Sequence, residues 1–270
     1  MRIAFLGGGN MASALIGGLL KKGVDASWIS VIEVSPAARE RLAARHGVHA
    51  STAPDAATQK ADTLVLAVKP QDLRPAAAAL AASVRGKLVV SIAAGVRLEA
   101  LSRWLGGHRK LVRCMPNTPA LIGAGISGLY ALPEVSQDER ERTQTILGAV
   151  GEVVWLSEER LLDPVTAVSG SGPAYVFWFI EQLAESARKM GIPADAASKL
   201  ALHTVLGAAR LAAGSEESPA ELRRNVTSKG GTTEAALKVF DEEQLAQRFA
   251  RALEAASRRG ADIGAELGKG

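Results

Sequence analysis

The chain has 270 residues, of which 47% are hydrophobic and 22% are charged, a globular composition that excludes a disordered or collagen-like chain. This length allows one large domain or two modest ones. Residues 1–163 contain 19 Lys and Arg against 15 Asp and Glu, and the remainder contains 13 of each, so the net charge of +4 arises in the first part. Because only 4% of the residues are aromatic and the basic residues are scattered, we expect anionic small molecules as partners and no nucleic acid.

The sequence also bears on compartment, metal and membrane. A single cysteine, Cys114, excludes an intramolecular disulfide and favours a reducing compartment, so we expect a cytoplasmic protein. The histidines lack metal-ligand spacing, so no metal is expected. The apolar stretch Ile3–Leu20 is interrupted by Gly7–Asn10 where a secretory signal needs an unbroken core. The longest later apolar run, Ala174–Ile180, is too short to span a membrane, and we expect a soluble protein with no membrane partner.

Short β-rich runs alternate with helical segments in the first part of the chain. The expected strands are Arg2–Leu6, Trp28–Val34, Thr63–Val68, Leu88–Ile92 and Leu111–Cys114. The expected helices between them are Asn10–Lys22, Ala37–Arg45, Gln71–Val84 and Leu98–Leu105. Two further apolar runs, Ile126–Leu132 and Val153–Leu156, flank a helix at about Gln137–Val150. Strands so separated are joined by right-handed crossovers and are mostly parallel, which predicts a doubly wound α/β Rossmann domain over residues 1–162.

From Asp163 onward the pattern is helical. We expect an all-α domain over residues 163–270, with helices at Pro173–Met190, Ala194–Ala213, Pro219–Val226, Thr232–Phe240 and Glu242–Leu267. Apolar residues recur on one face of the last helix: Leu245, Phe249, Leu253, Ala256, Ile263 and Leu267. This stripe must be buried, either within the helical domain or against a second copy of the chain.

A glycine-rich turn follows the first strand and opens the first helix. It has the form of the dinucleotide-binding fingerprint, with Gly7 for the tight turn, Gly9 for close approach of a pyrophosphate, and Ala12 for close helix packing. The helix N-terminus at Asn10 and Met11 adds free N–H groups and a partial positive charge. A glycine turn without a ligand is the alternative, but the position after the first strand favours a nucleotide.

The end of the second strand gives a mixed signal about the nucleotide. Glu33 lies where an acid would accept hydrogen bonds from both ribose hydroxyls, which favours NAD. Ser35, however, can bond a 2′-phosphate, and Arg39 and Arg41 lie just beyond it. A solvated Glu33 without a ligand is the third interpretation.

Three later loops follow strand ends and should border the cofactor, because ligands lie at the carboxyl edge of a parallel sheet. They are Val68-Lys69-Pro70, Ala93-Ala94-Gly95 and Met115-Pro116-Asn117, of which the last offers Asn117 as a polar contact. Turn residues alone give the same pattern, and Lys69 can equally be a surface lysine.

Two segments of the second part are rich in glycine and hydroxyl groups. Ser169–Pro173 precedes an apolar helix, and Asn225–Thr233 precedes another. Hydroxyls and backbone N–H groups at a helix N-terminus form a natural carboxylate pocket, although helix capping by Ser and Thr explains the same residues.

These segments together resemble the pyrroline-5-carboxylate reductase family over nearly the whole chain and in the same order. The resemblance implies reduction of the cyclic imine 1-pyrroline-5-carboxylate to L-proline, the last step of proline biosynthesis, with NADPH as the cofactor and NADH as the alternative. It also implies an N-terminal Rossmann domain and a C-terminal helical dimerisation domain, forming a homodimer or a ring of dimers. Glu33 departs from the common preference of the family for NADPH.

The resemblance further implies site residues. Ser228 and Thr233 would contact the substrate, with the Thr233 hydroxyl on the ring nitrogen. Backbone N–H groups would hold the substrate carboxylate, and those are the N–H groups of Gly230, Gly231 and Thr232. Two residues match further positions near the substrate, Thr166 and Glu216. The substrate loop would face the nicotinamide of the neighbouring subunit.

The sequence lacks a strong general acid or base at these positions. A protonated cyclic imine is already electrophilic, so alignment of donor and acceptor is sufficient for hydride addition. A β-hydroxyacid dehydrogenase is one alternative, against which the missing lysine near Ser169–Phe177 counts. A non-catalytic nucleotide sensor is the other.

Overall fold

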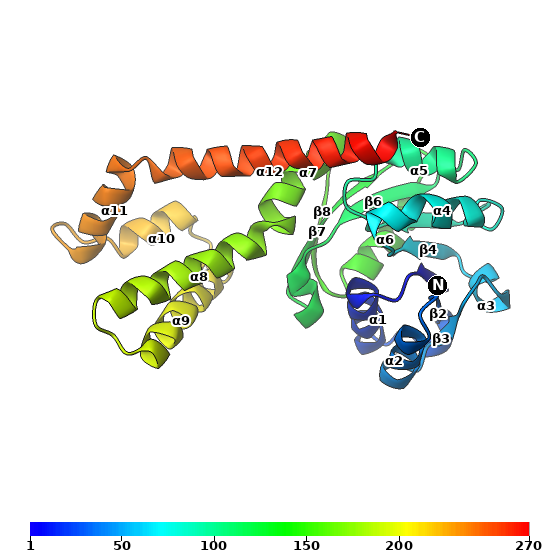
Figure 1. Cartoon of the computed structure of the whole chain (residues 1–270), viewed down its shortest axis with the longest axis horizontal. Helices are drawn as coiled ribbons and strands as arrows, with labels where there is room; N and C mark the ends of the chain where they lie inside the picture. The colour runs from blue at the N-terminus through cyan, green and yellow to red at the C-terminus, as the bar shows by residue number, and fades with distance from the viewer. Residues whose placement is uncertain (270) are drawn as a thin grey trace. The chain divides into compact units, whose positions relative to one another are not determined.

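An eight-stranded sheet organises the first part of the chain in the computed structural model, which describes residues 1–269 (Figure 1). The strand order is β3-β2-β1-β4-β5-β6-β7-β8, and all neighbouring pairs are parallel except β6 and β7. The strands are β1 Ile3–Leu6, β2 Ile29–Ile32, β3 His49–Ser51, β4 Thr63–Leu66, β5 Leu88–Ser91, β6 Leu111–Met115, β7 Gly125–Ala131 and β8 Gly151–Trp155. The doubly wound α/β prediction is therefore confirmed.

Helices cover both faces of this sheet. They are α1 Asn10–Lys21, α2 Pro36–His46, α3 Ala56–Gln59, α4 Pro70–Leu80, α5 Leu98–Trp104, α6 Gln137–Leu147 and α7 Leu162–Val165. One apolar cluster joins Phe5 of β1 to α1, α2 and α6, and a second joins the adjacent Leu6 to α4 and α5. Successive strand residues point to opposite faces of the sheet, and both faces are covered. β1, β2, β4 and β5 are therefore buried at every residue, as their continuous apolar sequences predict.

Three short elements were not predicted, β3, α3 and the four-residue α7. β3 has three residues, is partly exposed and pairs with β2 at the edge of the sheet. α3 has four residues and is held by a capping box between Asp55 and Thr58. Such short segments show no hydrophobic periodicity in the sequence. β3 is stabilised by strand pairing and α3 by its capping box.

The helices of the second part are α8 Gly172–Lys189, α9 Ala194–Ala213, α10 Pro219–Asn225, α11 Thr232–Glu242 and α12 Leu245–Gly268. The last helix starts later than predicted because Gln244 has a positive φ of 54°, which separates α11 from α12. Within residues 1–269, no helix is both long and apolar enough to cross a membrane.

The chain forms two compact units, Gly172–Glu254 and Met1–Ser171 together with the residues from Ala255 onward. The expected boundary lies earlier, after Leu162, and the sequence did not indicate that the end of α12 belongs with the sheet. In the first unit, Ile263 and Leu267 pack at Gly95, which follows β5. The apolar stripe of α12 is thus divided between the two units.

Candidate active site

Five predicted loops lie at one edge of the sheet. They follow β1, β2, β4, β5 and β6, which run parallel to one another, so all five loops leave the sheet at the carboxyl ends of their strands. This is the edge at which open α/β sheets bind ligands. The loops thus share the edge that the sequence predicts, and their contact with a cofactor stays a prediction.

The turn after β1 has the geometry that its glycines predict. Gly7 has φ of +96°, and a Cβ there would lie 2.8 Å from the Ala67 carbonyl oxygen. A Cβ on Gly9, which precedes α1, would meet nothing within 4 Å, so this side of the loop is open. Ala12 is fully buried against the sheet.

The N-terminus of α1 suits a pyrophosphate. Among the described residues, no side chain caps this helix at Gly9, and its first turn, which includes Asn10 and Met11, contains no acid. The N–H groups and positive end of α1 therefore remain available for an anion. The cradle at Gly7 and Gly9 fits a dinucleotide.

Glu33 contacts this loop directly. Its Oε2 accepts a hydrogen bond from the Gly8 N–H at 2.8 Å, and its Oε1 accepts one from the Ser35 N–H at 2.8 Å. Arg39 Nη1 donates to the backbone oxygens of Glu33 and Val34 at 2.7 and 2.9 Å. An acid and a cation thus lie together at the end of β2, and both features of the mixed sequence signal are present.

The loop after β4 lies close to the first, and the loop after β5 is shaped by its own contacts. Val68 adjoins Gly7, since a Cβ on Gly7 would be 3.0 Å from Val68 Cγ1. Lys69 is exposed and precedes Pro70, the first residue of α4. The loop Ala93-Ala94-Gly95 begins with a hydrogen bond from the Ala93 N–H to Ser91 Oγ at 3.4 Å. It ends at Gly95, where φ is +79°.

Asn117 has a structural partner. Its Oδ1 accepts a hydrogen bond from the Ile126 N–H at 3.0 Å, and the residue is buried. This contact joins the loop after β6 to the start of β7. The contact of Asn117 with a cofactor stays a prediction.

The segment at Ser169–Pro173 differs from the sequence prediction. It is not the free start of a helix, because α7 continues through a π-helical turn, Thr166–Gly170, into α8. The Thr166 hydroxyl donates to the Leu162 carbonyl at 2.7 Å, and the Ser169 hydroxyl donates to Val165 at 3.0 Å. Gly170 instead serves close packing, since a Cβ there would lie 2.5 Å from Met115 Cε. The predicted pocket of free N–H groups here is therefore wrong, although π-helical turns are frequent at functional sites.

The second predicted anion site lies in the other compact unit, in the loop between α10 and α11. Gly230 has φ of +71°, and its N–H donates to Glu234 Oε2 at 2.7 Å. The Gly231 N–H donates to the Ser228 carbonyl at 3.0 Å, and a Cβ on Gly231 would lie 2.5 Å from Ser228 Oγ. The loop thus folds tightly over Gly231.

Thr232 and Thr233 are the first two residues of α11. In the part of the chain that the structure describes, no side chain caps this helix at Gly231. Their N–H groups and hydroxyls therefore gather at a helix N-terminus, where a carboxylate is stabilised.

Glu216 is exposed in the loop between α9 and α10. Its neighbour Glu217 is the residue tied to this region, because it accepts hydrogen bonds from Asn225 Nδ2 at 3.1 Å. A role for Glu216 in substrate binding stays a prediction.

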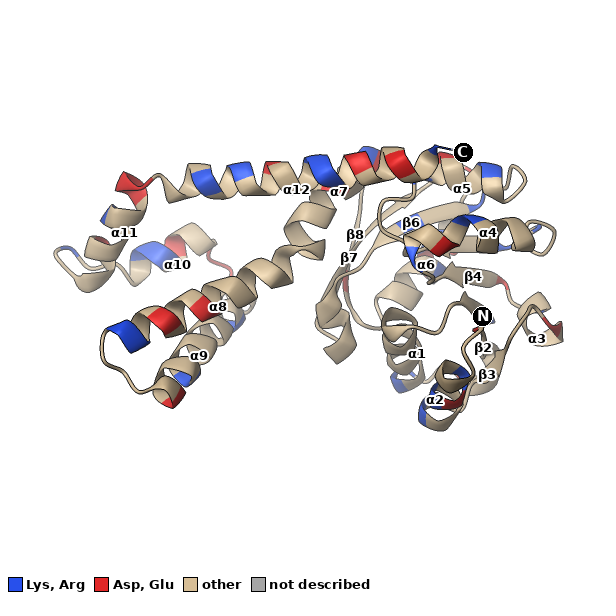
Figure 2. Cartoon of the chain, in the orientation of Figure 1, with Lys and Arg blue, Asp and Glu red and all other residues tan. Residues whose placement is uncertain are grey.

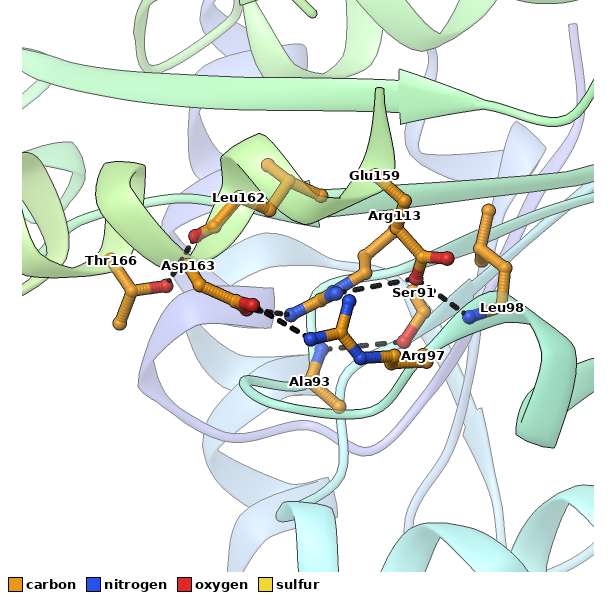
Figure 3. Close-up of polar contacts among 9 residues, drawn as sticks. All are labelled: Ser91, Ala93, Arg97, Leu98, Arg113, Glu159, Leu162, Asp163 and Thr166. Atoms are coloured by element: carbon orange, nitrogen blue, oxygen red, sulfur yellow. Dashed lines mark hydrogen bonds and ion pairs between the residues drawn. The ribbon is translucent and has the colours of Figure 1, made fainter. Parts of the chain in front are cut away.

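A group of charged side chains that the sequence did not predict lies beside the loop after β5, as Figure 3 shows. They are Arg97, Arg113, Glu159 and Asp163, joined by ion pairs. One signal was available, because Arg113 stands within the apolar strand Leu111–Met115, and a charge in a buried strand needs a partner.

Both parts of the chain match known families. Residues 159–263 match the family described as pyrroline-5-carboxylate reductase dimerisation, and residues 2–95 match the one described as NADP oxidoreductase, coenzyme F420-dependent. The pyrroline-5-carboxylate reductase of Pseudomonas aeruginosa is 46% identical over 99% of this chain and 98% of its own length. That of Pasteurella multocida is 42% identical over 95% of each chain.

Solved structures give the same result. The pyrroline-5-carboxylate reductase of Coxiella burnetii has a TM-score of 0.93 and 40% identity, covering 97% of this chain and 98% of its own. The Plasmodium falciparum pyrroline carboxylate reductase with NADP bound has a TM-score of 0.84 and 26% identity, covering 98% of each chain. At these identities and coverages, the chain belongs to the pyrroline-5-carboxylate reductase family.

Proposed function

We propose that this protein reduces 1-pyrroline-5-carboxylate to L-proline, the last step of proline biosynthesis. The observation that carries the proposal is the uncapped N-terminus of α11, where Thr232 and Thr233 offer N–H groups and hydroxyls to a small carboxylate. The predicted dinucleotide site at α1 supports it, because the family uses a nicotinamide cofactor. The reaction class is hydride transfer to a carbon–nitrogen double bond.

The bound nicotinamide dinucleotide would supply the hydride. The turn at Gly7 and Gly9 and the start of α1, at Asn10, Met11 and Ala12, would hold its pyrophosphate. Val68, Lys69, Pro70, Ala93, Ala94, Gly95 and Asn117 would border the rest of it.

The chain's own residues position the imine. The first-turn N–H groups of α11 would bind the substrate carboxylate, with Ser228 as a further contact. The amides of Gly230 and Gly231 would join them by exchanging their present partners, Glu234 and the Ser228 carbonyl, for the substrate. The Thr233 hydroxyl would hydrogen-bond the ring nitrogen and orient it. Because a protonated imine already attracts hydride, this alignment replaces a strong general acid.

NADPH is the cofactor we propose, with NADH as the alternative. Ser35 and the cation Arg39 lie at the end of β2 and would favour a 2′-phosphate. Glu33 lies at the same place and would favour ribose hydroxyls. The solved Plasmodium falciparum relative has NADP bound, which supports the first choice.

The working unit that we propose is a homodimer, or a ring of dimers, without nucleic acid or membrane as partner. Within Gly172–Glu254, an apolar groove is lined by Tyr175, Trp178, Phe179, Phe240 and Phe249. The first half of α8, residues 172–180, carries no charge, as Figure 2 shows. Exposed apolar surface of this extent marks an interface, and the dimerisation family match covers it.

A cytoplasmic location completes the proposal. Cys114 is free and buried, and burial raises the pKa of its thiol, so the thiol stays protonated and unreactive. The thiol is thus a packing group, as suits a reducing compartment.

The deciding experiment mixes the purified protein with 1-pyrroline-5-carboxylate and NADPH, and separately with NADH, and follows the loss of reduced-nicotinamide absorbance. We expect oxidation together with formation of proline. Binding of nucleotide without turnover would instead support the sensor, and turnover of 3-hydroxy acids alone would support the hydroxyacid dehydrogenase.

A further inference from the structure

Two cations and two anions form a compact cluster beside the loop after β5 (Figure 3). At its centre, Arg113 of β6 contacts both acids, with Nη1 3.2 Å from Glu159 Oε1 and Nη2 3.4 Å from Asp163 Oδ1. Arg97 Nη2 lies 2.7 Å from the other oxygen, Asp163 Oδ2. Each charge therefore has a partner of opposite sign, and the cluster is neutral as a whole.

The centre of the cluster is buried, whereas Arg97 and Glu159 at its edge are partly exposed. Arg113 and Asp163 are 3% and 6% exposed, and among residues 1–269 Arg113 is the one buried cation. Removing paired charges from water is costly, so such a cluster is weak evidence for added stability. What it provides that apolar residues do not is a fixed orientation, because guanidinium groups hold carboxylates in a defined geometry.

The cluster joins the loop after β5 to the segment that leads into α7. Besides Arg113, Glu159 Oε1 accepts a hydrogen bond from the Leu98 N–H at 2.8 Å, at the first turn of α5. Arg97 directly precedes α5 and follows the loop Ala93-Ala94-Gly95 closely. Asp163 belongs to α7 and lies three residues before Thr166, which begins the π-helical turn.

The end of α12 packs against the same residues. A Cβ on Gly264 would lie 2.8 Å from the Gly95 carbonyl oxygen and 3.6 Å from Arg97 Nε. A Cβ on Gly260 would lie 4.0 Å from Asp163. Three segments far apart in the sequence therefore meet at Arg97 and Asp163, all within the first compact unit.

We propose that this cluster is a positioning device for hydride transfer, with Arg97 and Asp163 as positioning residues. It holds the Ala93–Gly95 loop, on the cofactor side, at a fixed place relative to α7 and Thr166, on the substrate side. The inference rests on the proposed function, in which Ala93–Gly95 borders the cofactor, and on the family resemblance, which places Thr166 near the substrate. Small displacements between reacting groups reduce the rate of hydride transfer far more than they weaken binding.

The test uses Arg97→Gln in the full-length protein. The Arg97 side chain is 34% exposed, so its loss is more readily tolerated than that of the buried Asp163. The matched control is Arg109→Gln, which removes the same group from an exposed ion pair with Glu134. Three quantities are compared: kcat and KM for the imine, the dissociation constant of NADPH, and amide hydrogen exchange of residues 91–97 and 162–170 without ligand.

For Arg97→Gln we expect a kcat lower by about tenfold or more. The dissociation constant of NADPH should stay at the wild-type value, and exchange should rise in both segments. Arg109→Gln should match the wild type in all three measurements. Asp163→Asn, at a temperature where it remains folded, should reproduce the Arg97→Gln pattern.

Two results would overturn the positioning role. One is an Arg97→Gln protein with the wild-type kcat, whether or not exchange rises, because the cluster would then only support the fold. The other is a fall in kcat that is matched by lost NADPH affinity, which would make Arg97 a binding residue. A wild-type protein without imine reduction would instead overturn the proposed function, which the exchange measurement does not require.

Discussion

At the residue scale, two carboxylates of the chain occupy backbone amides of the loops proposed to bind anions. Glu33 accepts from the Gly8 N–H, and Glu234 accepts from the Gly230 N–H. A cofactor ribose or a substrate carboxylate that approaches these amides meets a negative charge already there. We therefore expect an acid of the protein to influence binding at both loops, and its removal to change selectivity.

Glu33→Gln tests this at the cofactor site. The change keeps the size of the side chain and removes its charge, so repulsion of a 2′-phosphate is lost and the hydroxyl acceptor is weakened. We expect the ratio of kcat/KM for NADPH over NADH to rise about tenfold, equivalent to about 1.4 kcal/mol. Glu40→Gln, at an exposed position of the following helix α2, is the control. A ratio that stays constant or moves towards NADH would contradict the assignment.

Thr233→Ala tests the substrate site. Losing the hydroxyl removes the hydrogen bond proposed to orient the ring nitrogen, so kcat should fall roughly tenfold to a hundredfold while NADPH affinity is kept. Steady-state kinetics and a nucleotide titration measure the two effects. Thr233→Ser keeps the hydroxyl and should retain most of the activity. An unchanged rate for the alanine variant would remove Thr233 from the mechanism.

At the element scale, the single helix α12 contributes residues to both compact units. Its first residues, Leu245 and Phe249, line the apolar groove of Gly172–Glu254, and its later residues pack on the loop after β5. The second contact depends on a glycine, because Gly264 is buried against the Gly95 carbonyl. A side chain there must push two backbones apart.

Gly264→Ala should therefore lower the free energy of unfolding by about 1–3 kcal/mol. Gly260→Ala, one turn earlier in the same helix, meets Asp163 only at 4.0 Å and should be neutral or stabilising by up to about 1 kcal/mol. Urea unfolding at one fixed protein concentration measures both, since association also contributes to stability. Equal effects of the two substitutions would contradict the close packing at Gly264.

At the scale of the whole molecule, the helices of Gly172–Glu254 leave much of their apolar surface uncovered by the chain itself. Phe177, Trp178 and Phe249 are 66%, 60% and 53% exposed. Phe249 also meets Tyr175 edge to face, with ring centroids 6.4 Å apart. A second copy is the occupant that the dimerisation family match indicates.

Phe249→Asp should weaken self-association, because it places a charge on an apolar surface that a second copy would desolvate. We expect a shift from dimer towards monomer in sedimentation or light scattering. Imine reduction should fall with it, since the proposed site needs the neighbouring subunit. Gln247→Asp introduces the same charge on an exposed position of α12 that does not line the groove, and it should remain dimeric. A Phe249→Asp dimer of wild-type stability would place the interface elsewhere.

Local patterns were enough to predict much of this protein. The buried strands, the Gly7 turn and the start of α9 at Ala194 follow from apolar runs, glycine φ values and helix periodicity, which depend on residues close in sequence. The start of α11 at Thr232 was predicted for the same reason. The hydrogen bond from the Gly230 N–H to Glu234 was not predicted.

Long-range contacts set the rest. The pairing of β3, the continuous helix through Thr166–Gly170 and the division of α12 between two units depend on neighbours distant in sequence. The ion pairs of Arg113 join residues 46 and 50 positions apart. Sequence periodicity does not predict such pairs. A buried charge is paired only when the folded chain brings its partner close and excludes water from both groups.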